Sequence, residues 1–193
     1  MKWIGNRISY VDTPEKTTII ITPERVGVYK AIIGAWFFMW LTIGAVMIWA
    51  WNTFEMKANM KDQLSILLVI FLTFWMYYAV RVGRTFLWLM YGSEFLKIDK
   101  ISFSIKTAIK KYGTSKEYFI ENIDKISLAF PEKSSFQAAW ENSPWIRGGE
   151  RLTFDYKGKS IRFGRKLDEK EAKLLFQLIT KRIEEQLKKK NKN

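Results

Sequence analysis

Two long apolar segments dominate the first half of the chain. No charged residue stands between Ala31 and Phe54, a run of 24 residues, and a second uncharged run of 17 residues extends from Leu64 to Val80. About 20 apolar residues are enough to cross the ~30 Å hydrocarbon core of a bilayer. The pattern predicts a two-helix transmembrane hairpin over residues 23–91. Thr22 and Pro23 are typical of an N-cap and a first helical turn, so the first helix is expected to begin there.

The segments on either side of the apolar runs have the patterns of β structure. Short β-like runs at residues 3–11 and 17–21, with a turn signal between them, predict an N-terminal hairpin over residues 1–22. A lone hairpin is marginal in water, so this hairpin is expected to dock on the C-terminal domain. Gly92 is expected to end the second helix.

Apolar and polar residues alternate over most of residues 92–187, which predicts an antiparallel β domain. The strand signals lie at residues 95–98, 101–109, 118–120, 126–130, 152–156 and 161–163. Lys157-Gly158 joins the last two as a hairpin turn. Asp168 and Glu171 form a capping box for a C-terminal amphipathic helix with its apolar side turned to the sheet. The basic residues 188–193 are expected to be a disordered tail.

Strands closed by one C-terminal helix resemble the pleckstrin-homology-like (PH-like) fold. Two spans followed by such a domain are similar to the bacterial membrane-anchored PH-like proteins. The segments that carry the likeness are WLMYGSEFLKID, KYGTSKEYFIENIDKISL and RLTFDYKGKSIRFGRKLDEKEAKLLFQLITKRI. The layout is also similar to that of the photosystem I assembly factor family. The resemblance implies a membrane α+β protein with a PH-like antiparallel domain that acts as a scaffold or assembly aid.

Charge near the apolar runs predicts the membrane topology. Lys and Arg residues precede the first run and follow the second one. The loop between the two runs carries two lysines that are balanced by two acidic residues. The positive-inside rule then places both termini and the β domain in the cytoplasm. The expected location is the bacterial inner (cytoplasmic) membrane, in a multi-pass arrangement.

The chain has neither cysteine nor histidine. Disulfides, thiolate metal sites, histidine-based catalytic dyads or triads and histidine-ligated haem are therefore excluded. The remaining candidates for catalysis are carboxylates, and each has a plain structural reading, such as a helix start. No phosphate-binding glycine loop or metal-ligand spacing is present. The expectation is a protein without enzymatic activity, cofactor or metal.

Two sets of residues are candidate binding sites. Trp36 and Trp40 lie within the first apolar run, and Trp140 and Trp145 lie in the irregular segment 131–150. Exposed tryptophans are enriched at protein interfaces, and the first span carries more aromatic surface than a two-helix hairpin can bury, so these four are candidates for partner binding. The alternative is that Trp36 and Trp40 pack on a neighbouring helix or lipid and that Trp140 and Trp145 fold onto their own domain. The small residues Ala31, Ala35, Thr42 and Ala45 share one helical face, which the second span or, alternatively, a partner protein is expected to cover. The candidates for lipid headgroup contact are Lys30, Arg81, Arg84, Lys106, Lys110, Lys111 and Lys116.

These observations support two hypotheses of function. The first is a non-enzymatic scaffold, accessory subunit or assembly factor of a membrane protein complex, with lipids and other integral membrane proteins as partners. The alternative is a membrane-tethered sensor of anionic lipid headgroups that uses the basic PH-like surface. The net charge of +13 also suits nucleic acid. No nucleic-acid motif accompanies it, so no nucleic-acid partner is expected.

Overall fold

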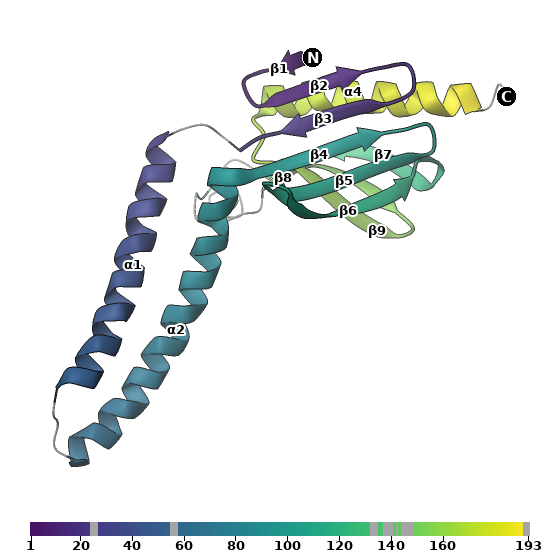
Figure 1. Cartoon of the computed structure of the whole chain (residues 1–193). Helices are drawn as coiled ribbons and strands as arrows, with labels where there is room; N and C mark the ends of the chain where they lie inside the picture. Colours follow the sequence, from purple (N-terminus) through teal and green to yellow (C-terminus); the bar gives the residue numbers. More distant parts are fainter. Residues whose placement is uncertain are drawn as a thin grey trace. The chain divides into compact units, whose positions relative to one another are not determined.

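The computed structural model describes residues 1–23, 27–54, 58–131, 135, 136, 141, 143 and 149–190. The chain divides into two compact units. The helix unit comprises Val26–Leu87, and the β domain comprises Met1–Arg25 together with Trp88–Asn193. Figure 1 shows their elements.

The helix unit holds two antiparallel helices, α1 (Gly27–Thr53) and α2 (Ala58–Tyr91), and α2 runs on into the β domain. Both are long and apolar enough to cross a membrane. Pro23 is not helical, and the described part of α1 begins at Gly27. The hydroxyl of Thr22 donates a hydrogen bond to the carbonyl of Arg7 and does not cap a helix that starts at Pro23. α2 ends at Tyr91, directly before Gly92, as predicted.

Nine strands are described, all in antiparallel pairs. A six-stranded sheet has the order β1 (Lys2–Ile4), β2 (Ile8–Asp12), β3 (Thr17–Ile21), β4 (Gly92–Ile98), β5 (Ser102–Ile109) and β6 (Tyr112–Phe119). A three-stranded sheet has the order β7 (Ile123–Leu128), β8 (Glu150–Tyr156) and β9 (Lys159–Arg165). The 3₁₀ turn η1 (Ile120–Asn122) joins the two sheets.

The N-terminal strands belong to the larger sheet, because β3 pairs with β4 from Thr17↔Ile98 to Ile21↔Glu94. The run at residues 3–11 is not one strand. It folds into β1 and β2 around a turn in which Gly5 has a φ of 60°, in the left-handed region that favours glycine. The expected hairpin at Lys157-Gly158 is formed by β8 and β9.

The core of the β domain lies between the two sheets and helix α4 (Glu169–Lys190). Three fully buried rings meet there: Phe103, Phe154 and Phe163, with ring centroids 5.5–5.8 Å apart. Burying each such ring contributes about 1.5–3 kcal/mol relative to exposure.

Helix α4 closes the domain through its predicted apolar stripe. Ala172, Leu175 and Ile179 are fully buried, whereas Phe176 is only half-buried. The predicted capping box is formed: the backbone N–H of Glu171 donates to Oδ1 of Asp168 at 2.6 Å, and the N–H of Asp168 faces Oε2 of Glu171 at 3.4 Å. α4 extends to Lys190, so residues 188–190 are helical and not part of a disordered tail.

Candidate functional site

Glycines allow the two helices of the helix unit to approach closely. A Cβ on Gly44 would lie 2.0 Å from the indole of Trp75, and one on Gly34 would lie 3.1 Å from the ring of Phe86. In the reverse direction, a Cβ on Gly83 of α2 would lie 3.1 Å from the ring of Phe37. Each glycine therefore receives an aromatic ring from the opposite helix.

Two tryptophans tie the helices together at the centre of this contact. Nε1 of Trp40 donates to the carbonyl of Trp75 at 3.1 Å, and Nε1 of Trp75 donates to the carbonyl of Trp40 at 2.7 Å. Trp36 stacks on Trp40 with ring centroids 5.4 Å apart. Trp40, a candidate for binding a partner, is thus engaged within its own chain, and Trp36 lies against it, half-buried.

The expectation for the small-residue face is wrong. Ala31, Ala35, Thr42 and Ala45 are all exposed on α1. The buried positions of α1 are Ile33, Gly34 and Gly44. Glycine permits a closer approach of a large ring than alanine or threonine does, so the aromatic side chains of α2 pack at the glycines. The other two candidates for partner binding, Trp140 and Trp145, lie outside the described residues.

The four candidate lysines of the β domain do not form one cluster. Lys106 on β5 pairs with Ser115, and Lys116 on β6 pairs with Ile105, whose side chain belongs to the core. Successive side chains of a strand point to opposite faces, so Lys106 and Lys116 lie on opposite faces of the sheet. Lys110 and Lys111 form the exposed turn between β5 and β6.

The remaining lipid candidates lie on the helix unit. Lys30 is half-buried in the first turn of α1, and Arg81 and Arg84 are exposed on α2. The guanidinium of Arg81 donates to the hydroxyl of Tyr77 at 2.8 Å, one helical turn earlier. This bond directs the Arg81 side chain back along α2.

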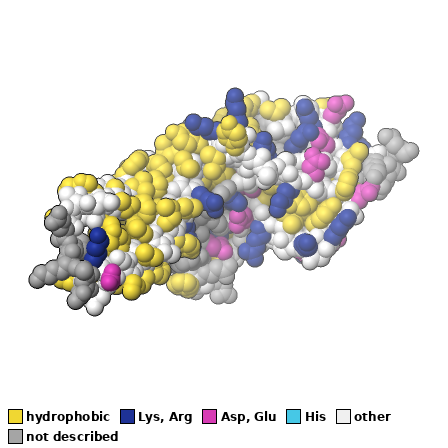
Figure 2. Space-filling view, turned by 60° about the horizontal axis from the view of Figure 1, so that its bottom comes forward, with side chains coloured by type: hydrophobic (Ala, Val, Ile, Leu, Met, Phe, Trp, Pro, Cys, Tyr) yellow, Lys and Arg dark blue, Asp and Glu magenta, His cyan; other side chains and the backbone are white. Residues whose placement is uncertain are grey.

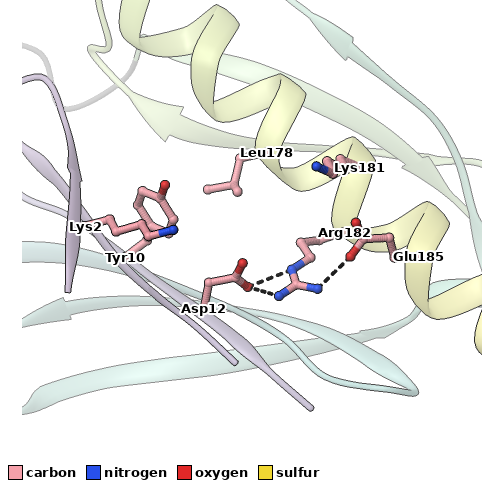
Figure 3. Close-up of a pocket in the computed structure, with 7 residues that line it drawn as sticks. All are labelled: Lys2, Tyr10, Asp12, Leu178, Lys181, Arg182 and Glu185. Atoms are coloured by element: carbon pink, nitrogen blue, oxygen red, sulfur yellow. Dashed lines mark hydrogen bonds and ion pairs between the residues drawn. The ribbon is translucent and has the colours of Figure 1, made fainter. Parts of the chain in front are cut away.

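A cluster of charged residues that the sequence did not indicate joins α4 to the turn after β2 (Figure 3). Nε of Arg182 donates to Oδ1 of Asp12 at 2.7 Å, and its Nη1 donates to Oε2 of Glu185 at 2.6 Å. Nη2 also contacts Asp12 and donates to the carbonyl of Thr13 at 3.1 Å. No local pattern links Asp12 to Arg182, because they are 170 positions apart.

The electrostatics of this cluster favour the ionised pair. Burial would raise the pKa of Asp12, but hydrogen bonds from Thr17 and Arg182 and the charge of Arg182 outweigh it and lower that pKa. The hydrogen bond to Asp12 in turn raises the pKa of Arg182. The hollow beside them measures about 260 Å³ and is also lined by Lys2, Tyr10 and Lys181. Because Arg182 already donates to Asp12, Thr13 and Glu185, we interpret the cluster as a clamp on α4.

A buried carboxylate joins the two sheets. Glu94 on β4 is 2% exposed, and its Oε2 accepts the backbone N–H groups of Gly164 and Arg165 on β9 at 3.1 and 3.2 Å. Burial raises the pKa of Glu94, and the two N–H groups and the Arg165 charge oppose that rise. The Arg165 guanidinium bonds Glu150 at 2.9 Å and lies 5.1 Å from the ring centroid of Trp88.

An apolar row crosses the outer face of the six-stranded sheet. The register Trp3↔Ser9↔Ile20↔Phe95 places these side chains on one face, opposite the row that contains Ile19 and Leu96 of the core. Trp3 is 55% exposed and its neighbour on this face, Val11, is 46% exposed. Ile20 and Phe95 are half-buried. We call Trp3, Val11, Ile20 and Phe95 the outer apolar row.

The outer face of a half-buried antiparallel sheet is commonly polar. An exposed apolar stripe on such a face is a feature of interaction surfaces. In the described part of the chain, no three carboxylates gather in a way that would hold a metal ion. Comparison of the chain with protein-family models and with curated protein sequences finds no match.

Proposed function

We propose that this protein is a non-enzymatic membrane-anchored scaffold, an accessory subunit or assembly factor of a membrane protein complex. In this proposal α1 and α2 cross the bacterial inner membrane as a hairpin. Both termini and the β domain then lie in the cytoplasm. The β domain supplies the binding surface, and other integral membrane proteins of the complex are its partners.

The exposed side chains of the helices support the membrane anchor. Large apolar side chains in the middle of α2 remain uncovered: Leu67 is 61% exposed, Val69 63% and Phe74 62%. Figure 2 shows such side chains gathered over the helices, where Lys and Arg are sparse. Exposure of so much apolar surface to water is unfavourable, by about 25 cal/mol per Å². Lipid removes this cost.

The order of the strands supports the PH-like assignment. Four consecutive antiparallel strands, β3 to β6, are followed by the three-stranded sheet β7 to β9 and by α4. The helix hairpin is inserted between the first and second of these strands. Likeness of fold alone does not imply chemistry, and the site must supply the function.

The outer apolar row is the observation that carries the binding role. Trp3 and Val11 expose apolar surface on a sheet face while the opposite face holds the core. Two ionisable groups of the domain, by contrast, are used internally: Glu94 joins the sheets and Arg182 holds α4. The row therefore offers an unpaired surface that a partner protein covers by burying apolar area.

A photo-crosslinking amino acid at the outer apolar row tests this proposal in native membranes. A benzophenone at Ile20 is expected to give one discrete protein adduct, and the same group at exposed Lys157 is expected to give none. The double substitution Trp3→Ala/Val11→Ala should abolish the Ile20 adduct. Substitution of two exposed apolar residues elsewhere on the β domain, Ile101→Ala/Phe119→Ala, should leave it unchanged. A diffuse smear or no adduct at Ile20 would contradict the binding role.

A further inference from the structure

The turn between β5 and β6 combines two lysines with Tyr112, the most exposed large apolar side chain among the described residues. Tyr112 is 86% exposed, and Lys110 and Lys111, which precede it, are exposed as well. Water is a poor solvent for an aromatic ring, so a tyrosine held at a turn tip has its best environment where an apolar and an aqueous phase meet. Lysine and tyrosine are both characteristic of membrane interfaces.

Hydrogen bonding fixes this turn at the end of α2. The backbone N–H of Lys110 donates to the carbonyl of Tyr91, the last residue of α2, at 2.8 Å. Nζ of Lys110 also lies 4.3 Å from the centroid of the Tyr91 ring. β4 begins at Gly92 with no residue between it and the helix. No linker therefore separates the turn from the point where α2 ends.

If α2 crosses the membrane as proposed above, its length places its C-terminal end, at Tyr91, near the lipid headgroups. Arg84 is the last charged residue of α2. A long basic side chain at this position reaches the headgroups. The seven residues from Arg84 to Tyr91 rise about 10 Å at 1.5 Å per residue. The headgroup layer is about 5–8 Å thick on each side. Tyr91, and with it the turn, thus lies at the outer boundary of the headgroups.

We propose that Lys110, Lys111 and Tyr112 form a contact site for anionic lipid headgroups. The two ammonium groups attract the lipid phosphates, and the Tyr112 ring enters the interfacial layer. This inference rests on the proposed membrane anchor. It assigns the lipid contact to the turn and not to Lys106 and Lys116, which lie on opposite faces of the sheet.

The β8–β9 turn is a matched control for the β5–β6 turn. Each turn has two residues, and the first is a lysine with positive φ: 55° for Lys110 and 49° for Lys157. The position equivalent to Tyr112 is Lys159. The β8–β9 turn follows Tyr156, which packs on Tyr118 with ring centroids 5.1 Å apart. Tyr118 pairs with Phe103, which pairs with Ile98 at the far end of β4 from the helix.

Fluorescence quenching in bilayer nanodiscs tests the site in the full chain. The chain has no cysteine, so Tyr112→Cys and Lys159→Cys each take a single environment-sensitive fluorophore. The nanodiscs contain phosphatidylcholine alone, or a 3:1 mixture with phosphatidylglycerol, and a lipid spin-labelled on its headgroup. Quenching at position 112 is expected to exceed that at position 159 at least twofold, and to be stronger with phosphatidylglycerol.

Charge reversal separates recognition of anionic lipid from mere proximity. Lys110→Glu/Lys111→Glu should remove the phosphatidylglycerol-dependent part of the quenching at position 112, whereas Lys157→Glu/Lys159→Glu should preserve it. If the double variant does not fold, Lys111→Glu alone is used in its place, because this single variant retains the contact of Lys110 with Tyr91. Equal quenching at positions 112 and 159, or quenching at 112 that depends on neither phosphatidylglycerol nor the lysines, would overturn the site.

A third label separates failure of this site from failure of the membrane anchor. A fluorophore at Leu67→Cys, in the middle of α2, should be quenched by a lipid spin-labelled in its acyl chain. Quenching at position 67 without quenching at position 112 would leave the anchor intact and refute the headgroup site. Absence of quenching at position 67 would refute the anchor, and the headgroup site with it.

Discussion

The helix unit and the β domain use similar apolar side chains in opposite ways. In the β domain, Phe103, Phe154 and Phe163 are buried against one another. In the helix unit, Phe38 and Phe74 are 61% and 62% exposed. The β domain excludes water from its core, whereas the helix unit keeps most of its apolar surface on the outside. In the proposed membrane anchor, lipid would cover the apolar surface that the helix unit leaves exposed.

Polar groups show the same contrast. The β domain buries ionisable groups that join its elements, such as Glu94 between the sheets and Arg7 beside Glu171 on α4, with N and O atoms 3.4 Å apart. Within the described contact between α1 and α2, the polar links are neutral indole-to-carbonyl bonds between Trp40 and Trp75. A buried ion pair carries a desolvation penalty that a neutral hydrogen bond avoids.

The largest expected loss of stability follows from removing a side chain from the core of the β domain. Leu175→Ala removes a fully buried side chain of α4 and should lower the free energy of unfolding by about 2–5 kcal/mol. Leu174→Ala, next to it but 50% exposed, should change that free energy by less than about 0.5 kcal/mol. Thermal unfolding in detergent, followed by circular dichroism, measures both. Equal effects would show that α4 does not pack by the described face.

A smaller effect is expected from crowding the helix contact. Gly44→Val places a side chain where the Trp75 indole lies, and such overpacking typically costs about 1–3 kcal/mol. Ala45→Val adds the same kind of bulk at an exposed position of α1 and should be neutral. Disulfide trapping between cysteines placed on α1 and α2 reports the distance between the helices. Retention of the native trapping pattern in Gly44→Val would contradict the glycine contact.

The reciprocal tryptophan bonds should contribute less. Hydrogen bonds between helices in membrane proteins are worth about 0.6 kcal/mol on average and at most about 1.7. Trp40→Phe and Trp75→Phe each remove one of the two indole bonds, and each is expected to lower the free energy of unfolding by an amount in this range. The measurement is unfolding in mixed detergent micelles. Unchanged stability in both single variants would contradict a contribution of these bonds to the helix contact.

Glu94 should make the stability of the β domain depend on pH, and this is the smallest effect that we expect. The pKa of Glu94 is raised by burial, so the folded state holds this proton to a higher pH than the unfolded state does. Its contribution to stability therefore falls as pH rises above 4.5, the ordinary pKa of a glutamate side chain. Glu94→Gln accepts the same N–H groups without a charge and should remove this decline. Parallel melting profiles of the two proteins between pH 4.5 and 8 would refute the assignment.

Much of the architecture follows from local pattern. The capping box at Asp168 and Glu171 and the hairpin at Lys157-Gly158 were predicted because a few neighbouring residues determine them. β6 was predicted only near Tyr118, because its other residues are exposed and carry no alternation. The split of the first strand depends on a single turn at Gly5, which lies inside an apparently continuous β pattern.

Binding surfaces were harder to predict than elements. The outer apolar row combines residues from β1 to β4 and exists only once the register brings Trp3, Ile20 and Phe95 onto one face of the sheet. The four candidate lysines do not form one cluster for the same reason, because the strand register places Lys106 and Lys116 on opposite faces of the sheet. The contact face of α1 was misassigned because both the alanine face and the glycine face are small, and only the rings of α2 distinguish them.

The proposed function requires that α1 and α2 cross a membrane, with the helix–helix connection on one side and the β domain on the other. Single cysteines in this cysteine-free chain report it directly: Asn59→Cys near the helix–helix connection, and Ser115→Cys on β6. In intact spheroplasts, a membrane-impermeant thiol reagent is predicted to label position 59 and to label position 115 only after lysis. Labelling of both positions before lysis, or of position 115 alone, would contradict a hairpin anchor with a cytoplasmic β domain.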